Sequence, residues 1–295
     1  MVKRNNRSPV IPILLIYVGL WVLRAVEYLV LRTDQGVVGE AVLHKLAGIV
    51  ILVLILRYLG LRGQQVGFTG YHAGQGLALG LLLGAGSYLL AYGVDYLLQL
   101  RAGQQPSLAL YVTSYSIDGN LGHQTGALFF AICIVGNIIN VVMEEGVFRG
   151  LFVRLAESRF RFGMALAFSS LLFGLWHVVA PLRSYLDGTM SGKGAMLVAL
   201  MLVVTTGLAG VKFGLLVKLT GSLWAAMADH FFNNVVINLL HIVTAGGADA
   251  MQTLRITIAQ TISFIVVLAF FVAKKAWQKQ TFRGEPGPWG KAAFK

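Results

Sequence analysis

Two adjacent glutamates and an arginine lie at the end of a long apolar run near the middle of the chain, in the stretch Asn140-Val-Val-Met-Glu-Glu-Gly-Val-Phe-Arg149. Glu145 and Arg149 are four residues apart and would share one face of a helix, whereas Glu144 points about 100° away from Glu145. Ionisable residues inside an apolar span are candidates for function by default. We therefore expect Arg149 to keep Glu145 ionised, and Glu144 to face a cavity and act as a general base. A salt bridge that only closes the helix accounts for the stretch about equally well.

Two later apolar segments each carry a histidine with a second residue one helical turn away. Phe173 and His177 are four residues apart, and so are His230 and Asn234, so each pair would share one face of its helix. A single histidine on an apolar helix is more often a buried core residue than a functional one. Two such pairs beside the glutamates favour function, because each buried polar group would otherwise need a partner of its own.

Counting residues from the turns indicates that these side chains lie at one depth. Glu144 precedes the turn at residues 159–161 by roughly 15 residues and His177 follows it by roughly 16, so antiparallel helices rising about 1.5 Å per residue would bring them level. By the same rise, His230 lies about a dozen ångström from the turn at residues 218–221. We expect three helices to share one polar layer.

The composition indicates that these elements lie in a membrane. Apolar residues make up 57% of the 295 residues and charged residues only 12%, whereas about a quarter of residues are charged in soluble domains. The sequence therefore predicts an all-α polytopic membrane protein with about eight transmembrane helices around a central polar cavity. No small-residue cleavage site follows the first apolar stretch, which favours a span over a signal peptide. The expected spans are residues 9–31, 41–59, 73–100, 125–143, 163–180, 195–216, 222–243 and 256–273.

The spans divide the chain into four regions. We expect an N-terminal three-span region with an extracytoplasmic loop (1–124), a catalytic core of spans four to seven (125–243), a last span (244–273) and a basic, disordered cytoplasmic tail (274–295). The polar segment 101–124 is the longest loop and has room for a short extra helix. Cys133 is the only cysteine in the sequence, which excludes an intrachain disulfide and a cysteine metal cluster.

The charge distribution favours a membrane over a nucleic acid as the partner. The net charge is +12, but the basic residues are scattered over short loops and tails and do not form an aromatic-rich binding face. Most of them fall in the loops that would lie on the same side as both ends of the chain. The positive-inside rule therefore predicts that both termini are cytoplasmic. The short loops and the lack of a retention signal suggest a prokaryotic cell membrane.

Four other polar residues in or near the spans have no clear functional partner in the sequence. Arg24 and Glu27 are three residues apart, and we expect them to form an ion pair with each other at an interface. His44 and His241 lie near helix ends without matched partners, so we expect them to be solvated or to cap helices.

The three motifs together resemble those of a known family. Glu144-Glu145-xxx-Arg149-Gly150, Phe173-xxx-His177 and His230-xxx-Asn234, in this order on separate helices, resemble the motifs of the CAAX protease and bacteriocin-processing (CPBP) family, which includes the Ras-converting CAAX endopeptidase. The resemblance covers about residues 127–240 and leaves out the first third of the chain and the basic tail.

The resemblance implies an eight-helix intramembrane endopeptidase whose conical cavity admits a peptide from the cytosolic side. Glu144 and His177 would activate the water, and His230 and Asn234 would hold the oxyanion. The supporting residues would be Glu145, Arg149 and Phe173. No cofactor and no metal are expected. The partners would be membrane lipid and a peptide or protein substrate, either lipidated or not.

Two alternatives remain open at this point. Two histidines and a glutamate are also the ligand types of a catalytic zinc site, although the sequence has no His-Glu-x-x-His motif and Asn234 suits an oxyanion better than a cation. The other alternative is a non-catalytic membrane protein, either an immunity or regulatory factor of the same fold or a small transporter that uses the buried charges as a pathway. We favour metal-free peptide hydrolysis over both.

Overall fold

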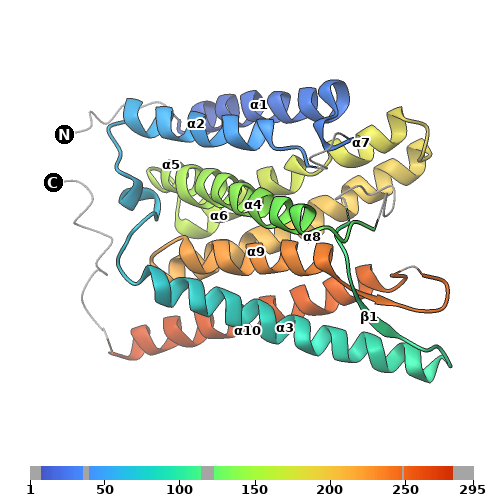
Figure 1. Ribbon diagram of the computed structural model, residues 1–295. Helices are drawn as coiled ribbons and strands as arrows, with labels where there is room; N and C mark the ends of the chain where they lie inside the picture. Colours follow the sequence, from blue (N-terminus) through green and yellow to red (C-terminus); the bar gives the residue numbers. More distant parts are fainter. Residues whose placement is uncertain (1–7, 36–39, 114–122, 248, 282–295) are drawn as a thin grey trace.

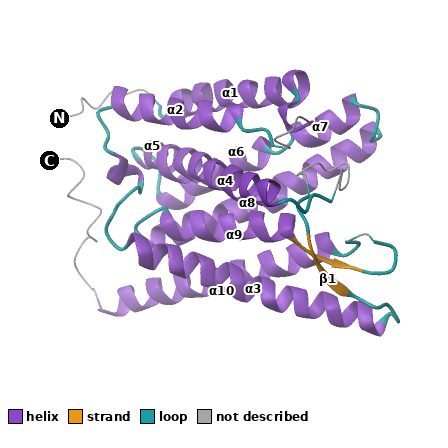
Figure 2. Ribbon diagram, in the orientation of Figure 1, coloured by secondary structure: helices purple, strands orange, loops and turns teal. Residues whose placement is uncertain are grey.

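The computed structural model describes residues 8–35, 40–113, 123–247 and 249–281, and these are mostly helical (Figures 1 and 2). Two π-helical segments, η1 (Glu27–Leu31) and η4 (Glu145–Phe152), continue α1 and α4, and two 3₁₀ turns, η2 (Thr33–Gln35) and η3 (Gly63–Val66), lie on either side of α2. The predicted all-α membrane fold is confirmed. The α-helices are α1 (Val10–Val26), α2 (Leu43–Tyr58), α3 (Ala73–Arg101), α4 (Ala127–Glu144), α5 (Val153–Glu157), α6 (Phe162–Trp176), α7 (Val179–Leu186), α8 (Gly192–Thr220), α9 (Trp224–Leu239) and α10 (Gln252–Thr281).

The helices run back and forth along one axis, as a bundle that crosses a membrane would (Figure 1). Among the described residues, six helices are long and apolar enough to span a bilayer: Val10–Leu31, Ala73–Arg101, Ala127–Glu157, Phe162–Leu186, Gly192–Thr220 and Gln252–Trp277. The shorter α2 and α9 have 16 residues each, about 24 Å at the usual helical rise. They bring the number of passes to about eight, as expected.

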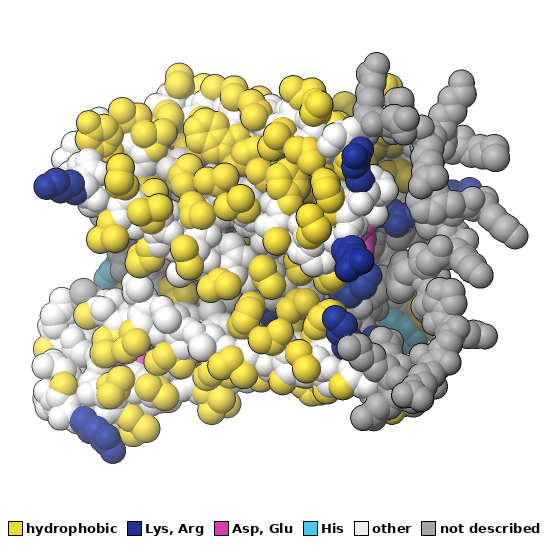
Figure 3. Space-filling model, turned by 180° about the vertical axis from the view of Figure 1, so that it is seen from behind, with side chains coloured by type: hydrophobic (Ala, Val, Ile, Leu, Met, Phe, Trp, Pro, Cys, Tyr) yellow, Lys and Arg dark blue, Asp and Glu magenta, His cyan; other side chains and the backbone are white. Residues whose placement is uncertain are grey.

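The outer surface of the bundle is apolar. Leu82 and Leu89 on α3 are 72% and 75% exposed, and Leu197 on α8 is 68% exposed. Figure 3 shows hydrophobic side chains across the middle of one face, with exposed Lys and Arg towards its two ends. A water-soluble protein rarely exposes an apolar surface this extensive. The chain is therefore an integral membrane protein whose lipid-facing band lies between charged ends.

The span expected at residues 222–243 is wrong after Leu239. There the backbone becomes extended, and β2 (Leu240–Val243) pairs antiparallel with β1 (Ser107–Leu110), with Ser107 opposite Val243. The expected extra helix in the 101–124 loop is likewise replaced by β1 in the described part of that loop, while residues 114–122 lie outside the described residues. Apolar and β-branched residues suit a strand once a partner strand is available.

Close contact between α3 and α9 fixes the helix that carries two of the motif residues. A Cβ added to Gly76 would lie 3.0 Å from Cβ of Trp224, and one added to Gly84 would lie 2.9 Å from the Phe232 side chain. Small residues let two helices approach closely inside a membrane. The close approach at Gly76 and Gly84 therefore fixes the position of α9 along α3 and its rotation about its own axis.

The last helix is longer than expected. α10 continues past residue 273 to Thr281, so the first part of the expected tail is helical, and residues 282–295 lie outside the described residues. The start of α1 and the end of α10 lie at the same end of the bundle (Figure 1).

Candidate active site

Glu144 and Glu145 lie at a change of helix type. Glu144 is the last residue of α4, and Glu145 begins the π-helix η4, whose residues are all buried. Cβ atoms added to Gly146 and Gly150 would lie 2.8 Å from a Leu52 methyl carbon and from the Val66 carbonyl oxygen, so α2 and the loop after it pack directly on η4. π-helical turns inside longer helices are rare and are frequent at functional sites. No feature of the sequence indicated this π-helix.

The Glu144 carboxylate is 2% exposed and has polar neighbours on four helices. Trp176 Nε1 donates a hydrogen bond to Oε1 at 2.8 Å, and Asn140 Nδ2 donates to Oε2 at 3.3 Å. Arg24 Nη1 on α1 lies 3.6 Å from Oε1, and His230 Nε2 on α9 lies 3.7 Å from Oε2. Donors and positive charge around a buried carboxylate favour its ionised form. Sequence reasoning missed Trp176, Asn140 and Arg24 as neighbours of this residue.

Glu145 joins the arginine of its own helix to the histidine of α9. Arg149 Nη1 lies 3.2 Å from Glu145 Oε1, the ion pair that the four-residue spacing predicts, and His230 Nδ1 lies 2.8 Å from the same oxygen. The Arg149 guanidinium also lies 3.8 Å from the centre of the Phe173 ring. Because Nδ1 of His230 donates a hydrogen bond to Glu145, its other ring nitrogen, Nε2, is left to face Glu144.

His177 follows directly after α6 and is half-buried. Its Nδ1 lies 2.8 Å from the Phe173 carbonyl oxygen, to which it donates a hydrogen bond, so in the neutral ring Nε2 is the acceptor. The Phe173 ring contacts both imidazoles, with its centre 4.9 Å from that of His177 and 6.1 Å from that of His230. Phe173 therefore lies between the two predicted histidines and connects α6 to α9.

Asn234 is 7% exposed and lies one turn after His230 on α9. Its side-chain oxygen accepts a hydrogen bond from Asn233 Nδ2 at 2.9 Å, and its main-chain oxygen accepts one from Asn238 Nδ2 at 2.6 Å. Residues four apart share a helical face, so Asn234 lies on the side of α9 that carries His230.

Comparison with known proteins agrees with this geometry. Residues 126–236 match the model of a family described as type II CAAX prenyl endopeptidase Rce1-like. Residues 126–236 are Rce1-like. The resemblance to the CPBP family is thus confirmed, and the match supports a CAAX-protease-like intramembrane endopeptidase at the level of the family. No curated protein matches the chain.

Outside the Rce1-like region, the expected Arg24–Glu27 ion pair is wrong. Arg24 reaches across to Glu144, and its guanidinium lies 4.7 Å from the centre of the Trp176 ring. Glu27 instead accepts a hydrogen bond from His44 Nδ1 at 2.6 Å, and His44 is 3% exposed, so the expectation of a solvated or capping histidine is also wrong. Packing against α2 and α6 supplies partners that the spacing within α1 cannot reveal.

His241 is also buried, contrary to expectation, but it lies at the strand pair and away from the glutamates. It is 0% exposed, its ring stacks on Tyr111 at 3.9 Å, and its Nδ1 lies 3.2 Å from Asp249 Oδ2. Arg255 forms ion pairs with both Asp249 and Asp95. Burial raises the pKa of the Asp249 carboxyl, but the hydrogen bonds from His241 and Arg255 outweigh burial and hold that pKa below its ordinary value.

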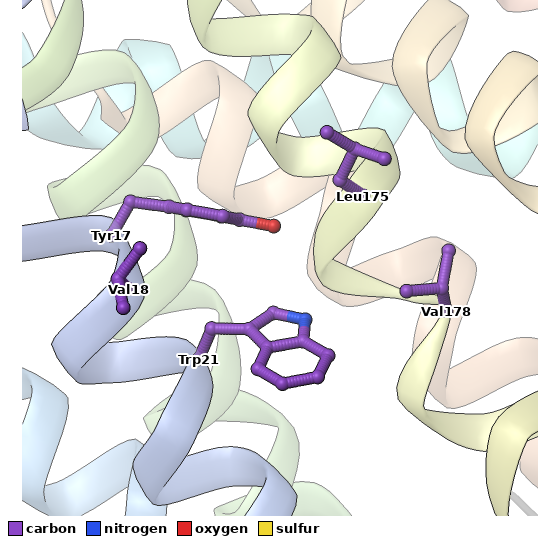
Figure 4. A pocket seen from close by; sticks show the side chains of 5 residues that line it. All are labelled: Tyr17, Val18, Trp21, Leu175 and Val178. Carbon is purple, nitrogen blue, oxygen red and sulfur yellow. The ribbon is translucent and has the colours of Figure 1, made fainter. Parts of the chain in front are cut away.

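A cavity of about 260 Å³ lies between α1 and the α6–α7 junction, next to the Rce1-like site (Figure 4). Tyr17, Val18 and Trp21 line it from α1, and Leu175 and Val178 line it from the opposite side. Leu175 and Val178 flank Trp176 and His177 in the sequence. The cavity is therefore an apolar neighbour of the site and does not contain the glutamates.

Within the part of the chain that the structure describes, no group of three or more His, Cys, Asp or Glu side chains could hold a metal ion. Glu144 and His230 have two of the side-chain types that zinc prefers, and their closest approach is 3.7 Å. The carboxylate and the imidazole therefore face each other at a distance slightly longer than a hydrogen bond.

Proposed function

We propose that this protein is an intramembrane endopeptidase that hydrolyses a peptide bond with a water activated by Glu144 and His177, and that His230 and Asn234 stabilise the oxyanion. One observation carries the proposal. Glu144 faces Nε2 of His230 at 3.7 Å, while Glu145, paired with Arg149, binds the other nitrogen of the same ring at 2.8 Å. The two adjacent carboxylates therefore have different partners and can have different roles.

Amide hydrolysis needs a base for the water, a donor for the developing oxyanion and an acid for the leaving amine. Glu144 takes one proton from the water, and the resulting hydroxide forms a bond to the carbonyl carbon. Glu144 then passes the proton that it took from the water to the leaving nitrogen as the C–N bond breaks. His177 Nε2 can accept a hydrogen bond from the same water, because its Nδ1 is held by the Phe173 carbonyl. A dehydrated site strengthens each of these interactions.

His230 is suited to the oxyanion because Glu145 lies on its other side. The carboxylate accepts a hydrogen bond from Nδ1 and so holds the ring with Nε2 on the side of Glu144, where a protonated Nε2 can donate to the oxyanion. Arg149 pairs with Glu145, and it is itself held by the Phe173 ring and by the Gly210 carbonyl, 3.4 Å from Nε. The supporting residues therefore act by fixing the orientation of His230.

The substrate in this proposal is a peptide or protein, either lipidated or not, that reaches a site near the middle of the bundle. We place both termini on the cytoplasmic side of a prokaryotic membrane, because the loops that share their end of the bundle carry most of the basic residues. Peptide entry from the cytoplasm follows from that orientation.

The test is cleavage of a reporter peptide by protein purified in detergent. Glu144→Gln should lower kcat by roughly a hundredfold or more, because the amide cannot accept the water proton, and His177→Ala and His230→Ala should do the same. Glu157→Gln is the matched control: Glu157 lies on α5, is partly exposed and pairs with Lys218 at 3.6 Å. Cleavage by Glu144→Gln at the wild-type rate would contradict the base assignment. A folded wild-type protein without peptidase activity would favour the non-catalytic alternative.

A further inference from the structure

A chain of polar side chains behind Asn234 begins at a fully buried lysine. Lys212 on α8 is 0% exposed, and its Nζ lies 2.6 Å from Asp229 Oδ2, 2.8 Å from Gln260 Oε1 and 3.0 Å from Ser263 Oγ. The ammonium group thus donates hydrogen bonds to Gln260 and Ser263 and forms an ion pair with Asp229. Lys212 therefore joins α8, α9 and α10 at one buried point.

The chemistry of lysine fixes the direction of every hydrogen bond that follows. An ammonium group only donates, so the Gln260 oxygen must face Lys212 and its Nε2 must donate onwards, to Asn233 Oδ1 at 2.7 Å. Tyr88 OH on α3 donates to the same oxygen at 2.6 Å. With its oxygen occupied by two donors, Asn233 must donate through Nδ2, to Asn234 Oδ1 at 2.9 Å.

We infer that Lys212, Gln260 and Asn233 are positioning residues that fix which end of the Asn234 amide faces the site. This inference rests on the proposed function, in which Asn234 is an oxyanion donor. An asparagine amide presents either NH₂ or oxygen after a half-turn about its last torsion. Because Asn233 binds the oxygen, Asn234 presents NH₂, and an oxygen in that place would repel the oxyanion. One oxyanion donor is worth about 10²–10³ in kcat.

This series of hydrogen-bonded side chains gives a role to Asn233, which precedes Asn234, and to helices outside the Rce1-like region. Asn233 and Asn234 are adjacent, and both lie about one turn after His230, but the Asn233 side chain is bonded to Gln260 on α10 and to Tyr88 on α3. Both of those helices lie beyond residues 126–236. The donor of the site is therefore oriented by parts of the chain that carry none of the three motifs.

The test is the isosteric change Asn233→Asp. The carboxylate still accepts from Tyr88 and Gln260 but cannot donate to Asn234 Oδ1, so the Asn234 amide turns its NH₂ towards the carboxylate and its oxygen towards the site. We expect kcat to fall about 100-fold with KM within about twofold, since the lost interaction forms only in the transition state. Gln260→Glu, which also cannot donate to Asn233, should lower kcat in the same direction.

The matched control is Asn238→Asp, one turn further along α9. It also removes a buried amide donor, which binds the main-chain oxygen of Asn234 at 2.6 Å, but it leaves the Asn234 side-chain amide alone. Its kcat should stay within about twofold of wild type in protein that remains folded by its melting curve. A fall in kcat equal to that of Asn233→Asp would overturn the inference, because it would indicate a general effect of buried charge.

A double-mutant cycle separates positioning from structure. In an Asn234→Ala background, Asn233→Asp should cause no further loss of kcat, because no amide remains to be turned; an additive loss would overturn the inference. The cycle also separates the two proposals. If Asn234→Ala alone cleaves at the wild-type rate, the oxyanion assignment fails, and the inference fails with it. If Asn234→Ala loses activity but Asn233→Asp does not, only the inference fails.

Discussion

At the scale of single residues, Glu144 and Glu145 are neighbours in the chain with different surroundings. Glu145 is bound by Arg149 and His230, both within 3.2 Å, and it is 0% exposed. Glu144 accepts hydrogen bonds from Trp176 and Asn140. A buried charge without a partner is costly, so each carboxylate depends on its own set of donors. Removing a partner of Glu145 should therefore leave the hydrogen bonds of Glu144 in place, and removing a partner of Glu144 should leave those of Glu145 in place.

Arg149→Ala should lower stability as well as activity. The change leaves Glu145 buried without its cation and removes the contact with the Phe173 ring, and breaking a buried ion pair costs about 3–5 kcal/mol. Thermal melting in detergent measures the effect. Arg159→Ala is the control, because Arg159 is exposed in the turn after α5 and should melt like wild type. An unchanged melting temperature for Arg149→Ala would count against the pairing.

Arg24→Met should lower kcat roughly tenfold and lower the melting temperature less than Arg149→Ala does, because Trp176 and Asn140 still donate hydrogen bonds to Glu144. Arg24 lies 3.6 Å from Glu144 and stacks on the Trp176 ring, so its loss removes positive charge from beside the proposed base, while the methionine still fills the apolar contact. Arg24→Lys should recover part of the rate. Arg57→Met, at an exposed position near the end of α2, serves as the control. Full activity in Arg24→Met would make this residue a purely structural part of α1.

At the scale of elements, the strand pair β1–β2 and the start of α10 form a second buried polar cluster. His241 lies between Tyr111 and Asp249, and Arg255 bridges Asp249 to Asp95 on α3. The cluster holds the loop after α9 against α3 and α10. The cluster is far from Glu144 and Glu145 in the sequence, and its ion pairs contribute to the stability of the fold.

The stability from this cluster should depend on pH through Asp249. Its pKa in the folded protein is lower than in the unfolded chain, so its contribution is full above the unfolded value of about 3.9 and is lost as pH falls through the folded value. We expect wild type to melt above Asp249→Asn at pH 6, and the gap to shrink below about pH 4. A gap in melting temperature that stays constant from pH 6 to pH 3 would contradict this sign.

At the scale of the whole molecule, helix packing gathers polar groups from most of the bundle into its centre while its outer surface stays apolar. The Rce1-like residues 126–236 supply the motifs, α1 supplies Arg24, and α3 and α10 supply the partners of Asn233. A bilayer favours this arrangement, because every buried polar group must find a partner within the protein. The helices outside the family region are therefore part of the proposed catalytic unit.

Elemental analysis of the whole purified protein separates glutamate from zinc catalysis. Zinc in a three-ligand catalytic site binds tightly and copurifies. We expect well under one zinc per chain, and peptidase activity that survives phenanthroline or EDTA at concentrations that inactivate a control metalloprotease. One zinc per chain, with activity that is lost on its removal and restored on its return, would make Glu144, His177 and His230 ligands instead of acid–base groups.

Local rules applied to the sequence were enough to predict the helical membrane fold, one contact within the motifs and the common depth of the motif residues. Helical spacing predicted the Glu145–Arg149 pair, and the rise per residue placed Glu144 and His230 at one depth, where they lie 3.7 Å apart. Both arguments succeed because they depend only on the regular geometry of a helix. The depth argument also needed the turns between helices, which glycine, arginine and polar residues mark in the sequence.

Only the tertiary structure decided which partner each buried polar group takes. Arg24 binds Glu144 and not Glu27, His44 and His241 are buried, residues 240–243 form a strand, and Lys212 anchors the amides behind Asn234. Spacing along one helix says which residues share a face, but not which helix that face meets. The packing of the helices therefore determines the partner of each buried polar group. A buried polar group left unpaired costs more free energy than is gained from the conformational preferences of the local sequence.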